Sequence, residues 1–127
     1  IAHTSGSLVR SMPKPTLFLK STCTSCREVR ALVAELGADV ILRDYAKKPL
    51  ERAEVEQIVT LAGGSAKVLN TRHAEAKEKG WINTAPDLST FVEAVLHEPN
   101  MLRRPILLKG KKLVIGKDEP AIRKLLG

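Results

Sequence analysis

The stretch Ser21-Thr22-Cys23-Thr24-Ser25-Cys26-Arg27 contains both cysteines of the chain and joins a predicted strand to a predicted helix. The run before it, Thr16-Leu-Phe-Leu-Lys20, is typical of a buried strand. After it, apolar side chains recur at helical spacing until Gly37, a common helix stop; they are Val29, Leu32, Val33 and Leu36. The cysteine pair therefore falls at a strand-to-helix turn, with Cys23 at or just before the helix N-terminus.

A cysteine in this position is favoured as a thiolate. Unpaired backbone N–H groups and the positive end of the helix dipole stabilise an anion there and depress the thiol pKa. A Cys-x-x-Cys pair in a βαβ context predicts a thioredoxin-like redox motif. The cysteine pair has two alternative interpretations. It could be half of a zinc site, but the sequence offers no second pair of ligands. The two cysteines could also be inert residues of the core. The polar residues around the pair favour the redox interpretation, and their hydroxyls can bind a thiolate or cap the helix.

Length and composition limit the other possibilities. The chain has 127 residues and a net charge of +7, a balance that can suit nucleic acid or anionic substrates. Its aromatic side chains are few, which argues against direct binding of nucleic acid. No apolar run reaches the ~18 residues of a transmembrane helix, so no membrane role is expected. Two cysteines do not form a disulfide scaffold, so we expect a reducing, cytoplasmic compartment. Residues 1–11 lack periodicity and resemble an expression tag, with Met12 as the native start.

The remaining elements predict an α/β protein. A second strand over 39–44 is expected to lie parallel to the first, because the helix between them is long enough for a crossover. Pro49 marks the start of a predicted helix over 50–62, and shorter helices are predicted over 65–69 and 74–79. A further helix is capped by Asp87 or Ser89. A hairpin over 106–115 follows, and the final helix runs from Asp118 or Glu119 to Leu126. This order predicts one thioredoxin-like domain, residues 12–127, with a mixed sheet and a helical insertion at about 50–100. We expect Trp81 and Ile82 to anchor the insertion, which would wall the cysteine site.

Four motifs together resemble a known family. They are Cys23-Thr-Ser-Cys26-Arg27, Asn70-Thr-Arg72, Leu102-Arg-Arg-Pro-Ile106 and Val114-Ile-Gly116. In this order, over residues 15–126, they resemble the ArsC/Spx family, which contains glutaredoxin-linked arsenate reductases and Spx-type regulators. The resemblance implies a thioredoxin-like fold and a cis peptide bond before Pro105.

The resemblance to the arsenate reductases implies that Cys23 is the nucleophile and that Arg72 and Arg104 bind the oxyanion. The planar guanidinium suits a tetrahedral oxyanion and would also stabilise the thiolate. Thr22 and Arg27 complete the predicted anion-binding set. The chain departs from those enzymes at Cys26, where Ser is common, and after the last strand, where Gly116-Lys117 replaces a third arginine.

We therefore expect a monomeric thiol–disulfide oxidoreductase in which Cys26 or an external thiol resolves the adduct on Cys23. The expected substrate is an oxyanion or an oxidised thiol, and the expected reductant is glutathione with glutaredoxin, or thioredoxin. No bound cofactor or metal is expected. His73, beside Arg72, is either a general base or a surface and packing residue.

The Spx-type regulators share both departures, and this resemblance implies a second possibility. They bind the C-terminal domain of the RNA polymerase α-subunit, and a disulfide switches them. The alternative prediction is thus a redox-switch transcriptional regulator that binds RNA polymerase without turnover.

Overall fold

Two apolar segments far apart in the sequence, β1 (Thr16–Leu19) and β3 (Ile106–Lys109), form the centre of a mixed four-stranded sheet. The computed structural model describes residues 14–127, so the predicted tag, residues 1–11, lies outside it. β2 (Ile41–Asp44) and β4 (Lys112–Ile115) complete the order β2-β1-β3-β4. β1 pairs parallel with β2 and antiparallel with β3, and β3–β4 is an antiparallel hairpin. The predicted thioredoxin-like α/β fold is confirmed.

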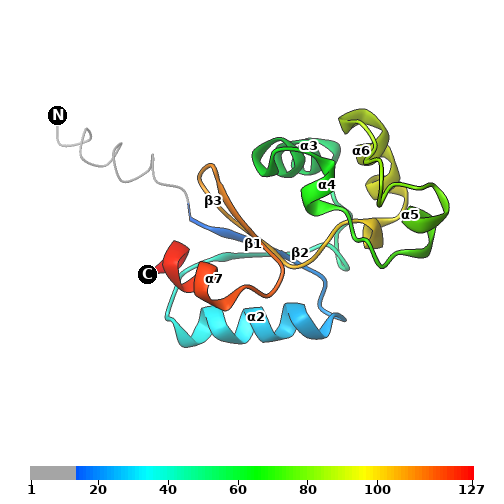
Figure 1. Ribbon diagram of the computed structural model, residues 1–127. Coiled ribbons are helices and arrows are strands. Elements are labelled where there is room, and N and C mark those ends of the chain that lie inside the picture. The colour runs from blue at the N-terminus through cyan, green and yellow to red at the C-terminus, as the bar shows by residue number, and fades with distance from the viewer. Residues whose placement is uncertain (1–13) are drawn as a thin grey trace.

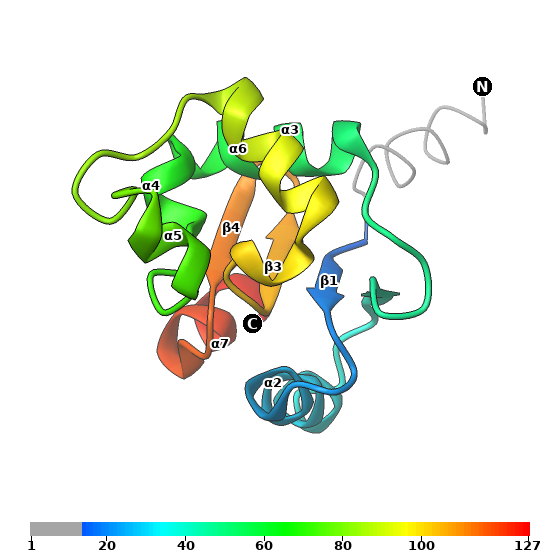
Figure 2. The same ribbon diagram turned by 90° about the vertical axis from the view of Figure 1, so that its right-hand side faces the viewer.

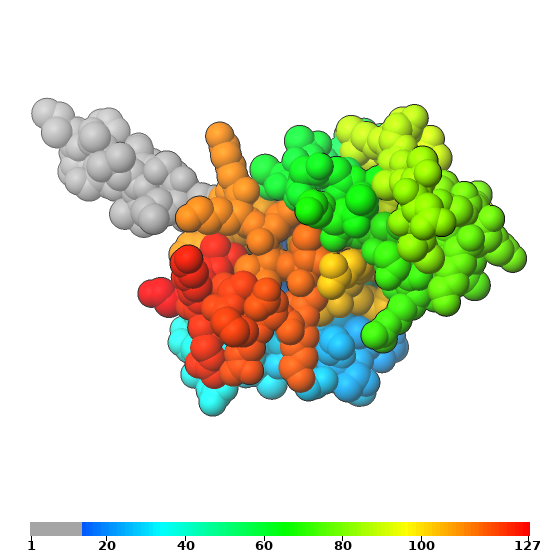
Figure 3. Space-filling view, viewed as in Figure 1, coloured from blue at the N-terminus to red at the C-terminus, as the bar shows by residue number. Residues whose placement is uncertain are grey.

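Helices cover both faces of this sheet (Figures 1 and 2). The crossover helix α2 (Thr24–Glu35) and the final helix α7 (Glu119–Leu126) lie on one side. The insertion lies on the other side and consists of α3 (Arg52–Ala62), α4 (Ser65–Val68), α5 (Ala74–Glu78), α6 (Leu88–His97) and the 3-10 turn η1 (Pro99–Met101). In the space-filling view the insertion, green to yellow, and α2, blue to cyan, are separate masses on either side of the orange hairpin (Figure 3).

The alternation of side chains along β1 explains its apolar run Leu17-Phe18-Leu19. Leu17 and Leu19 pack in one buried cluster with residues of α2 and α7. Phe18 points the other way, into the larger cluster formed with the insertion. A strand buried on both faces has no position for a polar side chain.

Some predicted boundaries are wrong. α3 begins at Arg52 rather than at residue 50, because Glu51 caps the helix in a reciprocal capping box with Glu54. β2 begins at Ile41 rather than at residue 39, and as an edge strand it leaves Ile41 about half exposed.

The predicted anchoring of the insertion holds for Trp81 and fails for Ile82. The Trp81 N–H donates to Ala76 O (3.0 Å), and the Gly80 N–H donates to Lys77 O (3.1 Å). This is a Schellman ending of α5, with Gly80 at positive φ, and it turns Trp81 back onto the core. Ile82 continues away from the core and stays 46% exposed.

No helix among residues 14–127 is both long enough and apolar enough to cross a lipid bilayer.

Candidate functional site

The N-terminus of α2 separates the two thiols. Cys23 is the N-cap residue, in an extended conformation, and is partly exposed. Cys26 lies one turn further on, is fully buried and belongs to the core cluster beneath α2. Both are free thiols, and the Lys20 N–H donates to Cys26 Sγ (3.4 Å). The structure thus presents one sulfur to solvent and keeps the other behind it.

The surroundings shift the two thiols in opposite directions. Partial burial raises the pKa of Cys23, but hydrogen bonds from the Cys26 N–H and from the Arg104 guanidinium outweigh it, so the pKa lies below the ordinary cysteine value. Burial raises the pKa of Cys26 to about 12, and the negative charge on Cys23 contributes to the increase. At neutral pH, Cys23 is therefore the more acidic and more accessible nucleophile.

Arg104 is held beside the thiol by a hydrogen bond to the insertion. It precedes Pro105, and the peptide bond between them is cis, as predicted. Its Nη1 donates to Asn100 Oδ1 (3.2 Å), which also accepts a hydrogen bond from Lys20 Nζ (2.9 Å). Within residues 14–127, Arg104 Nε is buried and has no hydrogen-bond partner.

A short pairing between two loops brings Arg72 to the same place. Leu69 and Leu102 form an isolated antiparallel bridge, and the Asn70 N–H donates to Met101 O (2.8 Å). Asn70 Nδ2 donates to Asn100 O (2.9 Å), while its Oδ1 accepts from the Arg72 N–H (3.1 Å). Asn70 therefore ties the loop that carries Arg72 to the segment that leads to Arg104.

These residues enclose a pocket of about 530 Å³. It is lined by Cys23, Asn70, Thr71, Arg72, Leu102, Arg103 and Arg104. Among the residues that the structure describes, the lining thus includes three arginines and no carboxylate. Such a pocket is suited to a small anion held against a thiolate.

The pocket unites three of the six predicted site residues, namely Cys23, Arg72 and Arg104. Cys26 lies behind Cys23 in the core, one helical turn away. Thr22 and Arg27 are exposed and do not line the pocket, so their roles in anion binding stay predictions.

Sequence reasoning missed two contributors, Asn70 as a connector and Arg103 as a lining residue. The signals were present in the quoted Asn-Thr-Arg motif and in the basic pair Arg103-Arg104. His73 caps α5 by accepting the Glu75 N–H at Nδ1 (3.2 Å), a contact that supports its packing role.

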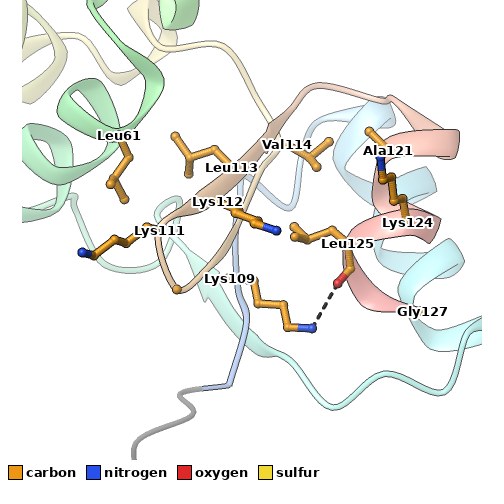
Figure 4. A pocket seen from close by; sticks show the side chains of 11 residues that line it. Leu61, Lys109, Lys111, Lys112, Leu113, Val114, Ala121, Lys124, Leu125 and Gly127 are labelled. Atoms are coloured by element: carbon orange, nitrogen blue, oxygen red, sulfur yellow. Dashed lines mark hydrogen bonds between the residues drawn. The ribbon is translucent and has the colours of Figure 1, made fainter.

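A larger pocket of about 990 Å³ lies at the free edge of β4, next to α7 (Figure 4). Its lining combines aliphatic side chains such as Leu113 and Leu125 with four lysines. Neither cysteine of the chain lines it. Across residues 14–127, no group of three or more His, Cys, Asp or Glu side chains could hold a metal ion.

Comparison with known proteins identifies the family. The sequence matches the model of the ArsC family over residues 18–125. The chain belongs to the ArsC family. Curated relatives include the global transcriptional regulators Spx of Streptococcus pyogenes serotype M3 and of Bacillus subtilis. Each is 30% identical over 112 residues, which is 87% of this chain and 84% or 86% of the regulator, respectively.

Solved structures of ArsC-like proteins share the fold. The arsenate reductase from Vibrio cholerae superimposes with a TM-score of 0.76 at 16% identity, over 91% of this chain and 98% of that chain. The YFFB protein superimposes with the same TM-score at 20% identity, over 90% of this chain and 100% of that chain. At these identities the likeness establishes the architecture and leaves the chemistry to the site itself.

Proposed function

We propose that this ArsC family member is a thiol–disulfide oxidoreductase in which Cys23 is the nucleophile and Cys26 the resolving thiol. The observation that carries the proposal is the contrast between the two sulfurs. Cys23 is accessible, has a lowered pKa and lines a pocket together with three arginines, whereas Cys26 is buried with its pKa raised to about 12. A nucleophile must be a thiolate at neutral pH, and a resolving thiol should not compete with it.

With a disulfide substrate, the Cys23 thiolate attacks one sulfur, and the other sulfur leaves as a thiolate that takes up a proton. The charge of Cys23, which helps to raise the pKa of Cys26, disappears in this mixed disulfide. Cys26 therefore becomes more acidic at the step in which it must lose its proton. It then attacks the Cys23 sulfur, expels the second substrate thiolate and forms the Cys23–Cys26 disulfide, so that two electrons reach the substrate.

With arsenate, the Cys23 sulfur replaces one oxygen, which leaves as water after protonation. Cys26 or an external thiol then attacks the Cys23 sulfur, a disulfide forms, and arsenic takes the electron pair of the S–As bond as it becomes As(III). Arg72 and Arg104 would hold the remaining oxygens. A cytoplasmic glutathione–glutaredoxin or thioredoxin system would return the protein to its dithiol form.

The test is NADPH consumption with arsenate, coupled in parallel to glutathione–glutaredoxin and to thioredoxin. We expect turnover that disappears in Cys23→Ser, while Cys26→Ser still attacks and accumulates a mixed disulfide detectable by mass spectrometry. Full activity of Cys23→Ser would show that the nucleophile is assigned wrongly.

A second function is favoured by the similarity to the Spx regulators, namely a redox switch that binds RNA polymerase without turnover. The discriminating experiment is a pull-down with the C-terminal domain of the polymerase α-subunit, using dithiol and disulfide forms of the protein. Binding that depends on the redox state, without NADPH turnover, would support the switch. Absence of binding in both states would eliminate it.

A further inference from the structure

The third arginine of the Cys23 pocket is Arg103, whose side chain is exposed and has no hydrogen-bond or ion-pair partner among residues 14–127. Its backbone is fixed, because the Arg103 N–H donates to Val68 O (2.8 Å). An arginine held at a pocket wall with its head group unpaired leaves its full set of donors for a ligand.

Gly116 explains where the Arg103 head group lies. A Cβ atom built on Gly116 would approach Arg103 Nη2 to 3.3 Å, so the guanidinium lies directly over the backbone of this glycine. The Gly116 N–H donates to Pro105 O (2.8 Å), which holds the end of β4 against the segment that carries Arg103 and Arg104. A Cβ at position 116 would force the guanidinium to shift by a few tenths of an ångström.

The lysine next to Gly116 is engaged elsewhere. Lys117 Nζ forms an ion pair with the Glu28 carboxylate on α2. Lys117 and Glu28 line a separate hollow beside α2, and neither belongs to the lining of the Cys23 pocket. The positive charge that follows β4 in sequence is therefore neutralised outside the site.

We propose that Arg103 is the third anion-binding guanidinium of the pocket and that Gly116 provides the space it occupies. The ligand class is a tetrahedral oxyanion with two or more negative charges. Three guanidiniums, from Arg72, Arg103 and Arg104, match the three oxygens that stay on the central atom while the Cys23 sulfur replaces the fourth. This inference rests on the proposed function, because it treats the anion as the group that Cys23 attacks.

The test measures anion binding without turnover. Inorganic phosphate or arsenate is titrated into the reduced protein, and the rate of Cys23 alkylation by iodoacetamide reports occupancy of the pocket. We expect Arg103→Gln to weaken the apparent affinity about tenfold, as loss of a charge-assisted contact does. Arg103→Lys should restore only part of it, because an ammonium lacks the planar fork.

Two variants serve as controls, Lys117→Gln for the rival cation and Arg30→Gln for an exposed arginine on α2 away from the pocket. Both should bind within about twofold of wild type, and circular dichroism should show all variants folded. The assignment of Arg103 is wrong if the anion protects Cys23 from alkylation equally well in wild type and in Arg103→Gln. It is also wrong if Lys117→Gln loses as much affinity for the anion as Arg103→Gln does. If phosphate and arsenate fail to protect wild type, the oxyanion site of the proposed function fails together with it.

Discussion

At the scale of single residues, Cys23 shows how one helical turn produces two different thiols. Its sulfur lies at the N-cap of α2, where the Cys26 N–H and the Arg104 guanidinium act on it together. The Cys26 sulfur, three residues later, faces the core and loses the solvation that an anion needs. The chemical difference is thus a consequence of helix geometry.

Arg104→Gln should make Cys23 less acidic, because it removes the neighbouring positive charge and the hydrogen bond to the thiolate. The midpoint of the pH profile of Cys23 alkylation should move to higher pH, and turnover with any substrate should fall about tenfold or more. Arg104→Lys keeps the positive charge, so it should preserve part of the lowering of the Cys23 pKa. An unchanged midpoint in Arg104→Gln would mean that the helix terminus alone acidifies Cys23.

Asn100 should position Arg104 without touching the substrate. Its Oδ1 accepts from both Arg104 and Lys20, so Asn100→Ala frees the guanidinium, and we expect turnover to fall about threefold to tenfold. The readout specific to positioning is the alkylation midpoint of Cys23, which should rise although no charge has been removed. Asn83→Ala, at an exposed turn residue, is the control. A loss of turnover with an unchanged midpoint would argue for a purely structural role.

At the scale of elements, the sequence predicted every strand and, within a few residues, every α-helix, because most of them are apolar runs or have an apolar period, with glycine or proline near their ends. What it could not predict depends on contacts between segments. The start of α3 was set by the Glu51–Glu54 capping box rather than by Pro49. The exposure of the Ile82 side chain depends on how the chain turns at the end of α5.

The site followed the same division. Cys23, Arg72 and Arg104 could be named from motifs, and the structure places them around one pocket. The placement of Arg103 next to Gly116 could not be predicted from the sequence. It requires the loop after β4 to lie against the segment before β3, and only the folded sheet brings these two together.

Gly116→Ala tests that junction. Gly116 has φ near +79°, so an added Cβ costs about 1 kcal/mol of stability and should lower the melting temperature by roughly 4–8 °C. It should also weaken phosphate binding, because the Cβ shifts the Arg103 guanidinium from its place beside Gly116. Gly37→Ala is the matched control, with φ near +68° and nothing within 4 Å of its Cβ. Both variants should lose stability, and only Gly116→Ala should lose affinity. Equal affinity for phosphate in the two variants would show that the contact between Gly116 and Arg103 does not affect anion binding.

At the scale of the whole molecule, the site exists only where three parts meet. α2 supplies Cys23, the segment before β3 supplies Arg103 and Arg104, and the insertion supplies Arg72. The bridge between Leu69 and Leu102 and the hydrogen bonds of Asn70 hold the insertion to the sheet segment at this point. Local opening of the insertion would therefore abolish anion binding before the sheet itself unfolds.

The buried acids of the core make global stability depend on alkaline pH. Burial raises the pKa of Cys26 to about 12 and raises the pKa of Tyr45 well above its usual range. A group whose folded pKa is raised contributes its full stability below the unfolded pKa and loses it as pH rises toward the folded pKa. For Cys26 this window runs from about pH 9 to about 12, and the free energy of unfolding should fall by about 1.4 kcal/mol per pH unit within it.

Urea unfolding of the reduced protein at several pH values between 9 and 11 measures this slope. Cys26→Ala should be less stable than wild type at pH 7, because it leaves a cavity in the core, yet its stability should fall less steeply with pH. The difference between the two slopes separates the contribution of Cys26 from that of Tyr45, which is present in both proteins. Cys23 does not mask the effect, because its folded pKa is lowered and its contribution is already complete above pH 9. Parallel slopes in the two proteins would mean that the Cys26 thiol ionises as easily when folded as when unfolded.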